Sequence, residues 1–333
     1  MKKLIALITS IMLAAFAFAG CSNGKTADGG KSDSKGKIKI GVIQFGSHSS
    51  LDNCYKGVKE ALDDAFGDKA DIDLQNGNFD SATCDSIAKN MVAKKYDIII
   101  PIATPAATAA YAAAAGTDIP VVFCAVSDPV AAGLVESVEK PGANCTGTSD
   151  ILNLDAQVDL IKAMQPDVKK IGVLYTTSEA NSVSQLKKLK DIAAKKGVEV
   201  VEQGVQSASD VPQAASSLAP KVDCINNFTD NNVVNNITTV FEQANAANIP
   251  VYGSEVEQVV KGCLASESID YVSLGKKTGD IAAKIINGEK ASDISVATIE
   301  ETAPVINTDV AEKFGIEIPE KYKDAQMVKT EQE

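Results

Sequence analysis

Polar side chains that could hold a small ligand recur directly after short apolar runs of the sequence. They lie in six segments, 45–48, 104, 127–128, 178–182, 228–231 and 253–255. Hydroxyl and amide groups exchange hydrogen bonds with a polar ligand, and carboxylates accept them from an ammonium group. The segments also contain two Phe residues and no Lys. This inventory predicts a site for a zwitterion that carries an apolar body.

The composition limits how the carboxylate of such a ligand can be held. The chain has no Arg, so all 32 basic residues are Lys, and two-pronged capture by a guanidinium group is excluded. Free backbone N–H groups at a helix N-terminus, together with a capping hydroxyl, are the alternative. Thr104 and the pair Asn181 and Ser182 stand where helices are expected to begin.

Acidic and apolar side chains in and near the same segments supply the rest of the predicted site. Asp128, Glu179 and Asp230 are candidates to accept hydrogen bonds from the ammonium group. Phenylalanine rings and an aliphatic side chain would pack against the apolar body. The full set of predicted ligand-binding residues is Phe45, Ser47, His48, Leu51, Thr104, Asp128, Glu179, Asn181, Ser182, Phe228, Asp230 and Ser254.

Several of these residues also have a purely structural interpretation. Thr104, Ser182 and Asp230 are of types that cap helices whatever the function. Asp128 precedes a proline, which favours a turn. His48 suits a loop or a helix cap as well as a ligand contact. The sequence alone leaves both interpretations open for each residue.

Other classes of chemistry lack the residues they need. His48 is the only His, so multi-His metal sites are excluded, and any His-dependent catalytic pair would have to use it. The nucleotide-binding patterns G-x-G-x-x-G and G-x-x-x-x-G-K-[ST] do not occur. A net charge of -12 repels phosphate backbones. We therefore expect no enzyme activity, cofactor, metal or nucleic-acid partner.

The length and the order of the elements predict an α/β protein with two lobes. The 333 residues correspond to about two domains. Apolar runs predict strands at 38–45, 71–74, 97–103 and 120–126, and then, after a restart, at 171–175, 198–202, 222–226 and 250–252. Helical patterns lie between them, for example at 84–95, 104–116, 182–196 and 232–247. This alternation predicts two doubly wound parallel sheets.

The last part of the folded chain indicates how the lobes are joined. Residues 265–272 and 295–306 read as extended segments, and 274–286 and 310–314 read as helices. A chain that returns to the first lobe after completing the second would form a hinge of two or three strands. Ligands bind beyond the carboxyl ends of parallel strands, so two facing lobes would enclose the site.

The first 36 residues are not expected to belong to the folded part. Two Lys residues precede an apolar run too short for a comfortable membrane span, which is typical of a secretory signal over 1–20. The stretch FAGC at 18–21 resembles a bacterial lipobox, in which Cys21 is acylated; an ordinary signal with a chance Cys is the alternative. Residues 21–36 are rich in Gly, Ser, Lys and Asp and predict a flexible tether.

Six cysteines follow the expected leader. An even number in an exported protein permits disulfides, whereas Cys124 and Cys224 lie in apolar strand-like runs that suit buried thiols. Both outcomes are compatible with the sequence. The six residues are Cys54, Cys84, Cys124, Cys145, Cys224 and Cys263.

Five stretches of the chain resemble one known family. IGVIQFGSHSSLD, PVVFCAVSDPVAAGLV, YTTSEANS, ASESIDYVSLGKKTG and VINTDVAEKFGIEIP are similar to the substrate-binding lipoproteins of ABC importers. The resemblance covers about 37–322, and its most similar branch binds aromatic amino acids such as tryptophan, tyrosine or phenylalanine. It implies a type I periplasmic-binding-protein fold with three crossings between two lobes.

The resemblance also implies lobe boundaries and a role. The N-terminal lobe would take 37–150 plus about 269–290, the C-terminal lobe 151–268 plus about 291–323, and 324–333 would form a tail. A monomer held at the outer face of the membrane by a lipidated Cys21 would deliver an amino acid to a permease and its ATPase. The ligand contacts implied by the resemblance are Ser47, Thr104, Glu179, Asn181, Ser182 and Asp230.

Two other functions stay open on the sequence alone. A lipoprotein of the same fold could report ligand occupancy to a signalling receptor instead of a transporter. An importer component for a branched-chain amino acid or a nucleobase-like solute would also fit a site without Arg and Trp. A permease and an ATPase encoded beside the protein would separate transport from sensing.

Overall fold

The computed structural model describes residues 36–299 and 302–331. The expected secretory signal, the expected acylation site Cys21 and nearly all of the expected tether lie outside the described residues. Within the described ranges, none of the helices is long and apolar enough to cross a membrane.

The first lobe is built on a parallel sheet with the strand order β11-β5-β4-β3-β1-β2. Its strands are rich in β-branched residues, and every residue of β3 is buried, as expected for a sheet covered on both faces. The strands are β1 Ile38–Gln44, β2 Ala70–Asn76, β3 Ile98–Ile102, β4 Val121–Phe123, β5 Cys145–Ser149 and β11 Ala297–Thr298.

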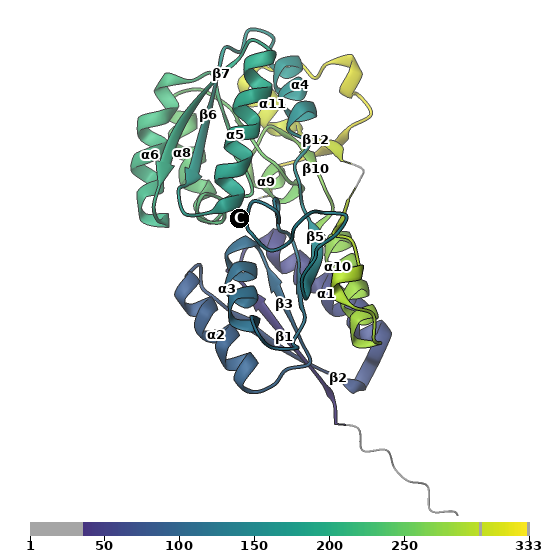
Figure 1. Ribbon diagram of the computed structural model, residues 1–333. Coiled ribbons are helices and arrows are strands. Elements are labelled where there is room, and N and C mark those ends of the chain that lie inside the picture. The colour runs from purple at the N-terminus through teal and green to yellow at the C-terminus, as the bar shows by residue number, and fades with distance from the viewer. Residues whose placement is uncertain (1–35, 300–301, 332–333) are drawn as a thin grey trace, which may run out of the picture. The chain divides into compact units, whose positions relative to one another are not determined.

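Two pairs of helices cover this sheet, α1 with α10 and α2 with α3 (Figure 1). The bounds are α1 Ser49–Phe66, α2 Ser81–Ala93, α3 Thr104–Ala114 and α10 Tyr271–Ile286. The backbones of α1 and α10 approach so closely that a Cβ atom added at Gly57 or Gly275 would lie 2.1 Å from a carbonyl oxygen of the other helix. Glycine is therefore required at both positions.

The second lobe contains a four-stranded parallel sheet with the order β7-β6-β8-β9. Its strands are β6 Lys170–Thr176, β7 Glu199–Val205, β8 Cys224–Asn226 and β9 Val251–Tyr252. Its helices are α4 Leu154–Met164, α5 Ala180–Lys195, α6 Val211–Leu218, α7 Asn231–Asn235, α8 Ile237–Ala246, α9 Val256–Lys261 and α11 Thr308–Phe314. Short 3₁₀ turns lie in both lobes. Those of the first lobe are Gly67–Lys69 and Ala291–Asp293, and those of the second are Ala208–Asp210, Ala219–Lys221 and Glu320–Tyr322.

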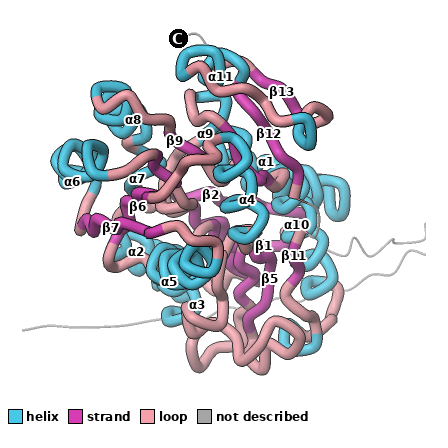
Figure 2. The backbone as a smooth tube through the Cα atoms, turned by 90° about the horizontal axis from the view of Figure 1, so that it is seen from above, coloured by secondary structure: helices cyan, strands magenta, loops and turns pink. Residues whose placement is uncertain are grey.

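A third sheet of three strands completes the second lobe. Strand β10 Ala265–Ser268 pairs antiparallel with β12 Ala303–Asn307, and β13 Gln326–Val328 pairs parallel with β12. Seen from above, β12 and β13 lie beside α11, on the far side of the second lobe from α6 (Figure 2).

The fold confirms the expected α/β class with doubly wound parallel sheets. The expected lobe boundaries differ from the structure in two places. Strand β11 pairs with β5 in the first lobe, although residues from about 291 were expected in the second. Strand β13 joins a sheet, although 324–333 was expected to be a tail. The chain thus stays in the first lobe through the end of β11.

Strand β5 has no counterpart among the expected elements, because its sequence CTGTS is polar. All five of its residues are buried. The hydroxyl of Thr146 donates to the carbonyl of Ile294 (2.7 Å), and Thr148 shares a hydrogen bond with Thr278 (2.7 Å). Hydrogen bonds within the protein thus replace hydrogen bonds to water for these hydroxyls, so the polar strand is buried without losing its partners.

The six described cysteines are all buried free thiols. This result decides between the two alternatives that the sequence left open. Burial raises the pKa of the Cys84 thiol to about 11 and that of the Cys145 thiol to about 12, so these two thiols are protonated at neutral pH.

Candidate functional site

A cavity lies between the two lobes, beyond the carboxyl ends of both parallel sheets. Its volume is about 20 Å³ in this structure, which is about enough for one water molecule, so the lobes lie close together around it. It is lined by His48, Ser50, Leu51, Ala103, Thr104, Ala125, Ser127, Asp150 and Tyr271 of the first lobe and by Asn181, Thr229, Asn231 and Glu255 of the second.

Four of the longer helices begin at this cavity, because the turns after parallel strands lead into helices there. His48 and Thr104 stand at the starts of α1 and α3, and Asn181 and Tyr271 lie in the first turns of α5 and α10. The first backbone N–H groups of a helix have no partner within it and carry partial positive charge. Asp270 caps these groups in α10, whereas no side chain caps them in α1, α3 and α5. Three helix starts therefore offer donors to an anionic group although the chain has no Arg.

The backbone at the cavity wall is strained at two alanines. Ala103 has a φ of 79° and Ala125 a φ of 55°, values that are uncommon for residues with a Cβ atom. Both residues line the cavity. Strain of this kind is found preferentially at binding sites, where the surrounding structure enforces it.

Two buried carboxyl groups form an acidic part of the cavity. Asp150 is 3% exposed and accepts hydrogen bonds from Ser127 Oγ and Tyr271 Oη, each at 2.9 Å. Glu255 is 1% exposed and accepts one from Gln258 Nε2 at 3.0 Å. Burial raises the pKa of Asp150, and burial together with the charge of Glu257 raises the pKa of Glu255 to about 8. A cation bound here would restore both carboxyl groups to their charged form.

Three polar side chains at the cavity have buried atoms without a hydrogen-bond partner among the described residues. These atoms are Oδ1 of Asn181, Oγ of Ser50 and both ring nitrogens of His48. Burial lowers the pKa of His48 to about 4, so its imidazole is neutral at physiological pH. Buried polar atoms normally have a partner, and a polar ligand in the cavity would supply one.

Glu179 does not line the cavity, but it accepts hydrogen bonds from two amide side chains that do, those of Asn181 and Asn231. Its Oε2 atom accepts hydrogen bonds from Nδ2 of Asn231 at 2.7 Å and from Nδ2 of Asn181 at 3.3 Å. Burial, and then the charge of Asp230, raise the pKa of Glu179 to about 8. Because Oε2 holds the Nδ2 group of Asn181, the amide oxygen of Asn181 is left free for the cavity.

Asp230 does not line the cavity, although it was predicted to accept an ammonium group. Its oxygens accept hydrogen bonds from Thr176 Oγ1 (2.8 Å), Ser182 Oγ (2.7 Å) and the Val233 amide (3.0 Å). The side chain thus caps α7 and ties it to the end of β6 and the start of α5. The hydroxyl of Ser182 is used in the same network.

The other predicted residues divide between the cavity and its surroundings. Four of the twelve line it, namely His48, Leu51, Thr104 and Asn181. Phe45 packs edge-on against Phe79 with ring centroids 5.8 Å apart, and Phe228 lies in the core of the second lobe. Ser47 accepts a hydrogen bond from Asn76, Ser254 donates one to the Asn227 carbonyl, and Asp128 faces α5.

Sequence reasoning missed Asp150 and Tyr271. Asp150 follows the polar strand β5, which carries no apolar run to mark it. Tyr271 begins α10 directly after its N-cap residue Asp270. That helix start, an Asp followed by an aromatic residue at the end of an extended crossover, is the one signal that could have pointed to the hinge side of the site.

Metal ligands do not gather in this cavity. In the part of the chain that the structure describes, no group of three or more His, Cys, Asp or Glu residues is placed to hold a metal ion.

Two parallel-sheet lobes that enclose a polar cavity define a class of proteins that bind small solutes by closing around them. The model of the family described as ABC transporter substrate binding protein matches residues 39–329. The chain belongs to this family. The family is one of substrate-binding proteins and not of enzymes, which confirms the resemblance seen in the sequence.

Relatives of known structure or name cover nearly the whole chain. It is 44% identical to a tyrosine-binding protein of Clostridioides difficile over 92% of this chain and 91% of that one. It is similar to a domain from Streptococcus pneumonia crystallised in complex with L-Trp, with 38% identity, a TM-score of 0.85 and coverage of 88% of this chain and all of that one.

A third relative has been solved without a ligand. The ligand-free, open structure of a substrate-binding protein with adhesive properties from Clostridium difficile is 42% identical and covers 88% of this chain and all of that one. Its TM-score is only 0.67, lower than that of the L-Trp complex despite the higher identity. The backbone of this chain is therefore more similar to that of the ligand complex than to that of the open structure.

Proposed function

We propose that this protein binds an aromatic amino acid, tryptophan, tyrosine or phenylalanine, and delivers it to the permease of an ABC importer. The observation that carries the proposal is the buried acidic pair Asp150 and Glu255 in a cavity that the starts of α1, α3 and α5 also line. Acidic groups together with N–H groups that no side chain caps match the two charges of an amino acid. The tyrosine-binding relative and the complex with L-Trp support the aromatic side chain.

The ammonium group of the ligand is assigned to the acidic side of the cavity. Asp150 and Glu255 supply carboxylates there, and Oδ1 of Asn181 supplies a neutral acceptor. An ammonium group has three N–H donors, so three acceptors satisfy it completely. Binding the cation in a buried acidic site also removes the cost of desolvating unpaired carboxylates.

The carboxylate of the ligand is assigned to the helix starts of the first lobe. Thr104 offers its hydroxyl and amide at the start of α3, and Ser50 and the neutral imidazole of His48 lie at the start of α1. Leu51 and Tyr271 provide apolar surface for the ring. The carboxylates of Asp150 and Glu255 would repel the carboxylate of the ligand, which favours this orientation.

A thermal-shift screen of the purified protein against amino acids, sugars and nucleosides tests the proposal. Ligand at 100 times its Kd stabilises the folded state by about 2.7 kcal/mol, and calorimetry then gives the affinity. The chain has no Trp, so indole emission that remains after unbound tryptophan has been removed comes from bound ligand. Stabilisation by aromatic amino acids is expected, and stabilisation only by leucine, isoleucine, valine or a nucleobase would replace the proposed ligand.

We also propose that the protein acts as a monomer outside the cytoplasm, anchored through an acylated Cys21. Substrate-binding proteins of ABC transporters work on the outer side of the membrane that holds their permease. The leader-like composition of 1–20 and the stretch FAGC that ends at Cys21 support this proposal.

A further inference from the structure

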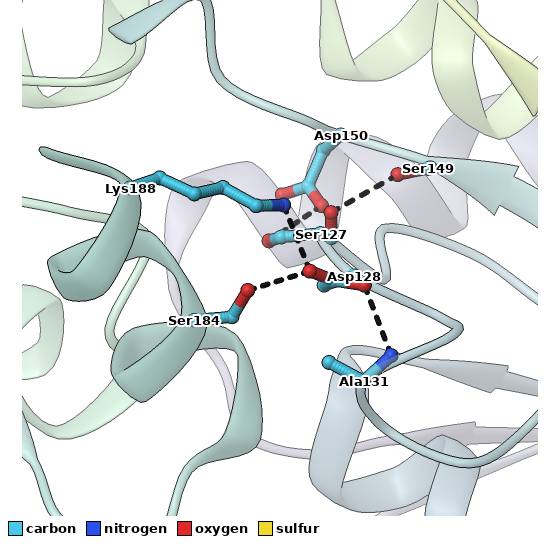
Figure 3. A network of polar contacts seen from close by, with 7 residues as sticks. All are labelled: Ser127, Asp128, Ala131, Ser149, Asp150, Ser184 and Lys188. Carbon is cyan, nitrogen blue, oxygen red and sulfur yellow. Dashed lines mark hydrogen bonds and ion pairs between the residues drawn. The ribbon is translucent and has the colours of Figure 1, made fainter. Parts of the chain in front are cut away.

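Asp128 joins the two lobes at the rim of the cavity. It follows β4 in the first lobe, and its Oδ1 atom accepts a hydrogen bond from the Ala131 amide at 3.0 Å. This bond within its own turn holds the carboxylate in one orientation. Its Oδ2 atom then accepts hydrogen bonds from Ser184 Oγ at 2.5 Å and from Lys188 Nζ at 2.8 Å (Figure 3).

Both partners belong to the second lobe. Ser184 and Lys188 are four residues apart on α5, so they lie one turn apart on the same face of the helix. Among residues 36–299 and 302–331, the pair Asp128 and Lys188 is the one ion pair that crosses between the lobes. The side chain of Asp128 is 17% exposed and that of Lys188 is 44% exposed, so the contact is partly shielded from water.

The residue before Asp128 connects this contact to the cavity. Ser127 lines the cavity, and its hydroxyl donates a hydrogen bond to Asp150. Its Oγ atom also lies 3.3 Å from Oγ1 of Thr229 in the second lobe. Two neighbouring residues of one turn therefore meet the second lobe together, one inside the cavity and the other at its rim. Neither contact can form when the lobes are apart.

We propose that Asp128, Ser184 and Lys188 form a latch between the lobes, which stabilises the closed state and slows ligand release without touching the ligand. This inference rests on the proposed function only because the experiments below measure the latch through ligand binding. Asp128 is then a positioning residue, and its carboxylate does not bind the ammonium group. The latch breaks when the lobes part, so it contributes to the closed state alone.

The latch predicts a specific pattern of affinities. The ligand enters while the lobes are apart and is held once they close, so its apparent Kd is inversely proportional to the equilibrium constant for closing the loaded protein. Weakening the latch lowers that constant by one factor, whatever the ligand. The Kd values for tryptophan and tyrosine should therefore rise by the same factor, whereas loss of a ligand contact would change their ratio. The closed complex should also dissociate faster, with little change in the association rate.

The first experiment measures calorimetric Kd values and stopped-flow release rates for tryptophan and tyrosine with the full protein and with Asp128→Asn and Lys188→Met. A partly exposed ion pair leads us to expect a rise in Kd of about two- to fivefold for each ligand. Lys190→Met is the matched control, because Lys190 lies on the same helix but pairs with Glu202 inside the second lobe. Its Kd values should equal those of the wild type.

A charge exchange tests the contact itself. Asp128→Lys places two like charges at the rim and should weaken binding more than Asp128→Asn does. Combining it with Lys188→Asp restores opposite charges across the gap and should recover most of the affinity. Recovery in the double variant would show that the two side chains act on each other, which a general folding defect would not reproduce.

Other outcomes would overturn the latch. Unchanged Kd values and release rates in Asp128→Asn would show that the contact contributes nothing to closure. A loss for one ligand only would make Asp128 a ligand contact. If the wild type binds another solute and no aromatic amino acid, the proposed function fails, and the same variants measured with that solute still decide on the latch.

Discussion

Four carboxyl groups lie almost fully buried in or directly behind the cavity. Asp150, Glu179, Asp230 and Glu255 are between 0% and 3% exposed, and none of them forms an ion pair with a Lys among the described residues. Burying acids without a counter-charge is costly unless a cation arrives or a proton is retained. The site is thus arranged for a ligand that brings positive charge.

Replacing Asp150 by Asn should weaken the binding of tryptophan by about 2 kcal/mol, roughly thirtyfold in Kd, because a buried ammonium group would lose a charged acceptor. The substituted amide still fits the positions of Ser127 and Tyr271, so the fold should be kept. Isothermal titration calorimetry measures the change.

The control for this variant is a ligand without the ammonium group. 3-Indolepropionate has the ring and carboxylate of tryptophan, and we expect Asp150→Asn to leave its affinity unchanged or to improve it. An equal loss for tryptophan and 3-indolepropionate would show that Asp150 supports the cavity and does not receive the ammonium group.

The buried acids also predict how stability depends on pH. The pKa of Glu179 and that of Glu255 are each raised to about 8 in the folded state, so the folded chain holds more protons than the unfolded chain above the usual Glu pKa. Stability from these groups is present at low pH and is lost as the pH rises through about 8. His48 has the opposite effect below its unfolded pKa of about 6.5, because its pKa falls to about 4.

The free energy of unfolding of the ligand-free protein should therefore decrease from pH 6.5 to pH 8. Glu179→Gln keeps the neutral shape of the side chain and should flatten this decrease. Urea titrations at the two pH values, with the wild type and the variant, give the slopes. Parallel slopes would mean that Glu179 is already charged in the folded protein at pH 6.5.

At the scale of single residues, the sequence predicted where the site lies better than it predicted which side chains line it. Residues after strands were expected to converge, and four of the twelve named ones do line the cavity. Asp230 and Ser182 were equally compatible with capping. Asp230 does cap α7 through the Val233 amide, whereas the hydroxyl of Ser182 donates a hydrogen bond to Asp230. The direction of a side chain after a strand depends on the turn that follows, and residue type alone does not specify that turn.

At the scale of elements, the contact between α1 and α10 attaches the returning chain to the first lobe. α10 follows the second crossing of the chain, and its Gly275 faces the carbonyl of Cys54 in α1. A close helix pair of this kind needs small residues on both sides. Tyr271, at the start of the same helix, reaches Asp150 in the cavity, so the helix contact also positions a residue of the site.

Gly275→Ala should destabilise the protein by about 1 to 3 kcal/mol or more, because the added methyl group would lie against a backbone oxygen that cannot move aside. Lys284→Ala, on the exposed face of the same helix, should change the free energy of unfolding by less than about 0.5 kcal/mol. Urea unfolding followed by circular dichroism compares them. Equal stabilities would show that the two helices can separate at no cost.

The alternation of strands and helices was predictable because apolar runs and helical periodicity are both local features. Strand β5 was not, since its hydroxyl-rich sequence is buried only through partners far along the chain. Strand β11 has two residues, too few for any pattern, and it joins the first lobe because its partner is β5. Pairing between distant segments decided these assignments, and no window of the sequence contains that information.

At the scale of the whole molecule, a lipid anchor would keep the binding protein near its permease. Cys21→Ala should release the protein from the membrane fraction into the soluble fraction after cell lysis, because the acyl anchor would be lost. Immunoblots of the two fractions measure the effect. Retention of the variant in the membrane fraction would refute anchoring through Cys21.

The six buried thiols can report how often each part of the molecule opens transiently. Cys54, Cys84, Cys124 and Cys145 lie in the first lobe, and Cys224 and Cys263 lie in the second. An alkylating reagent can reach them only while the surrounding structure is transiently open. Mass spectrometry of the labelled peptides would give the labelling rate of each cysteine, and hence the rate of local opening in each lobe, without an engineered cysteine.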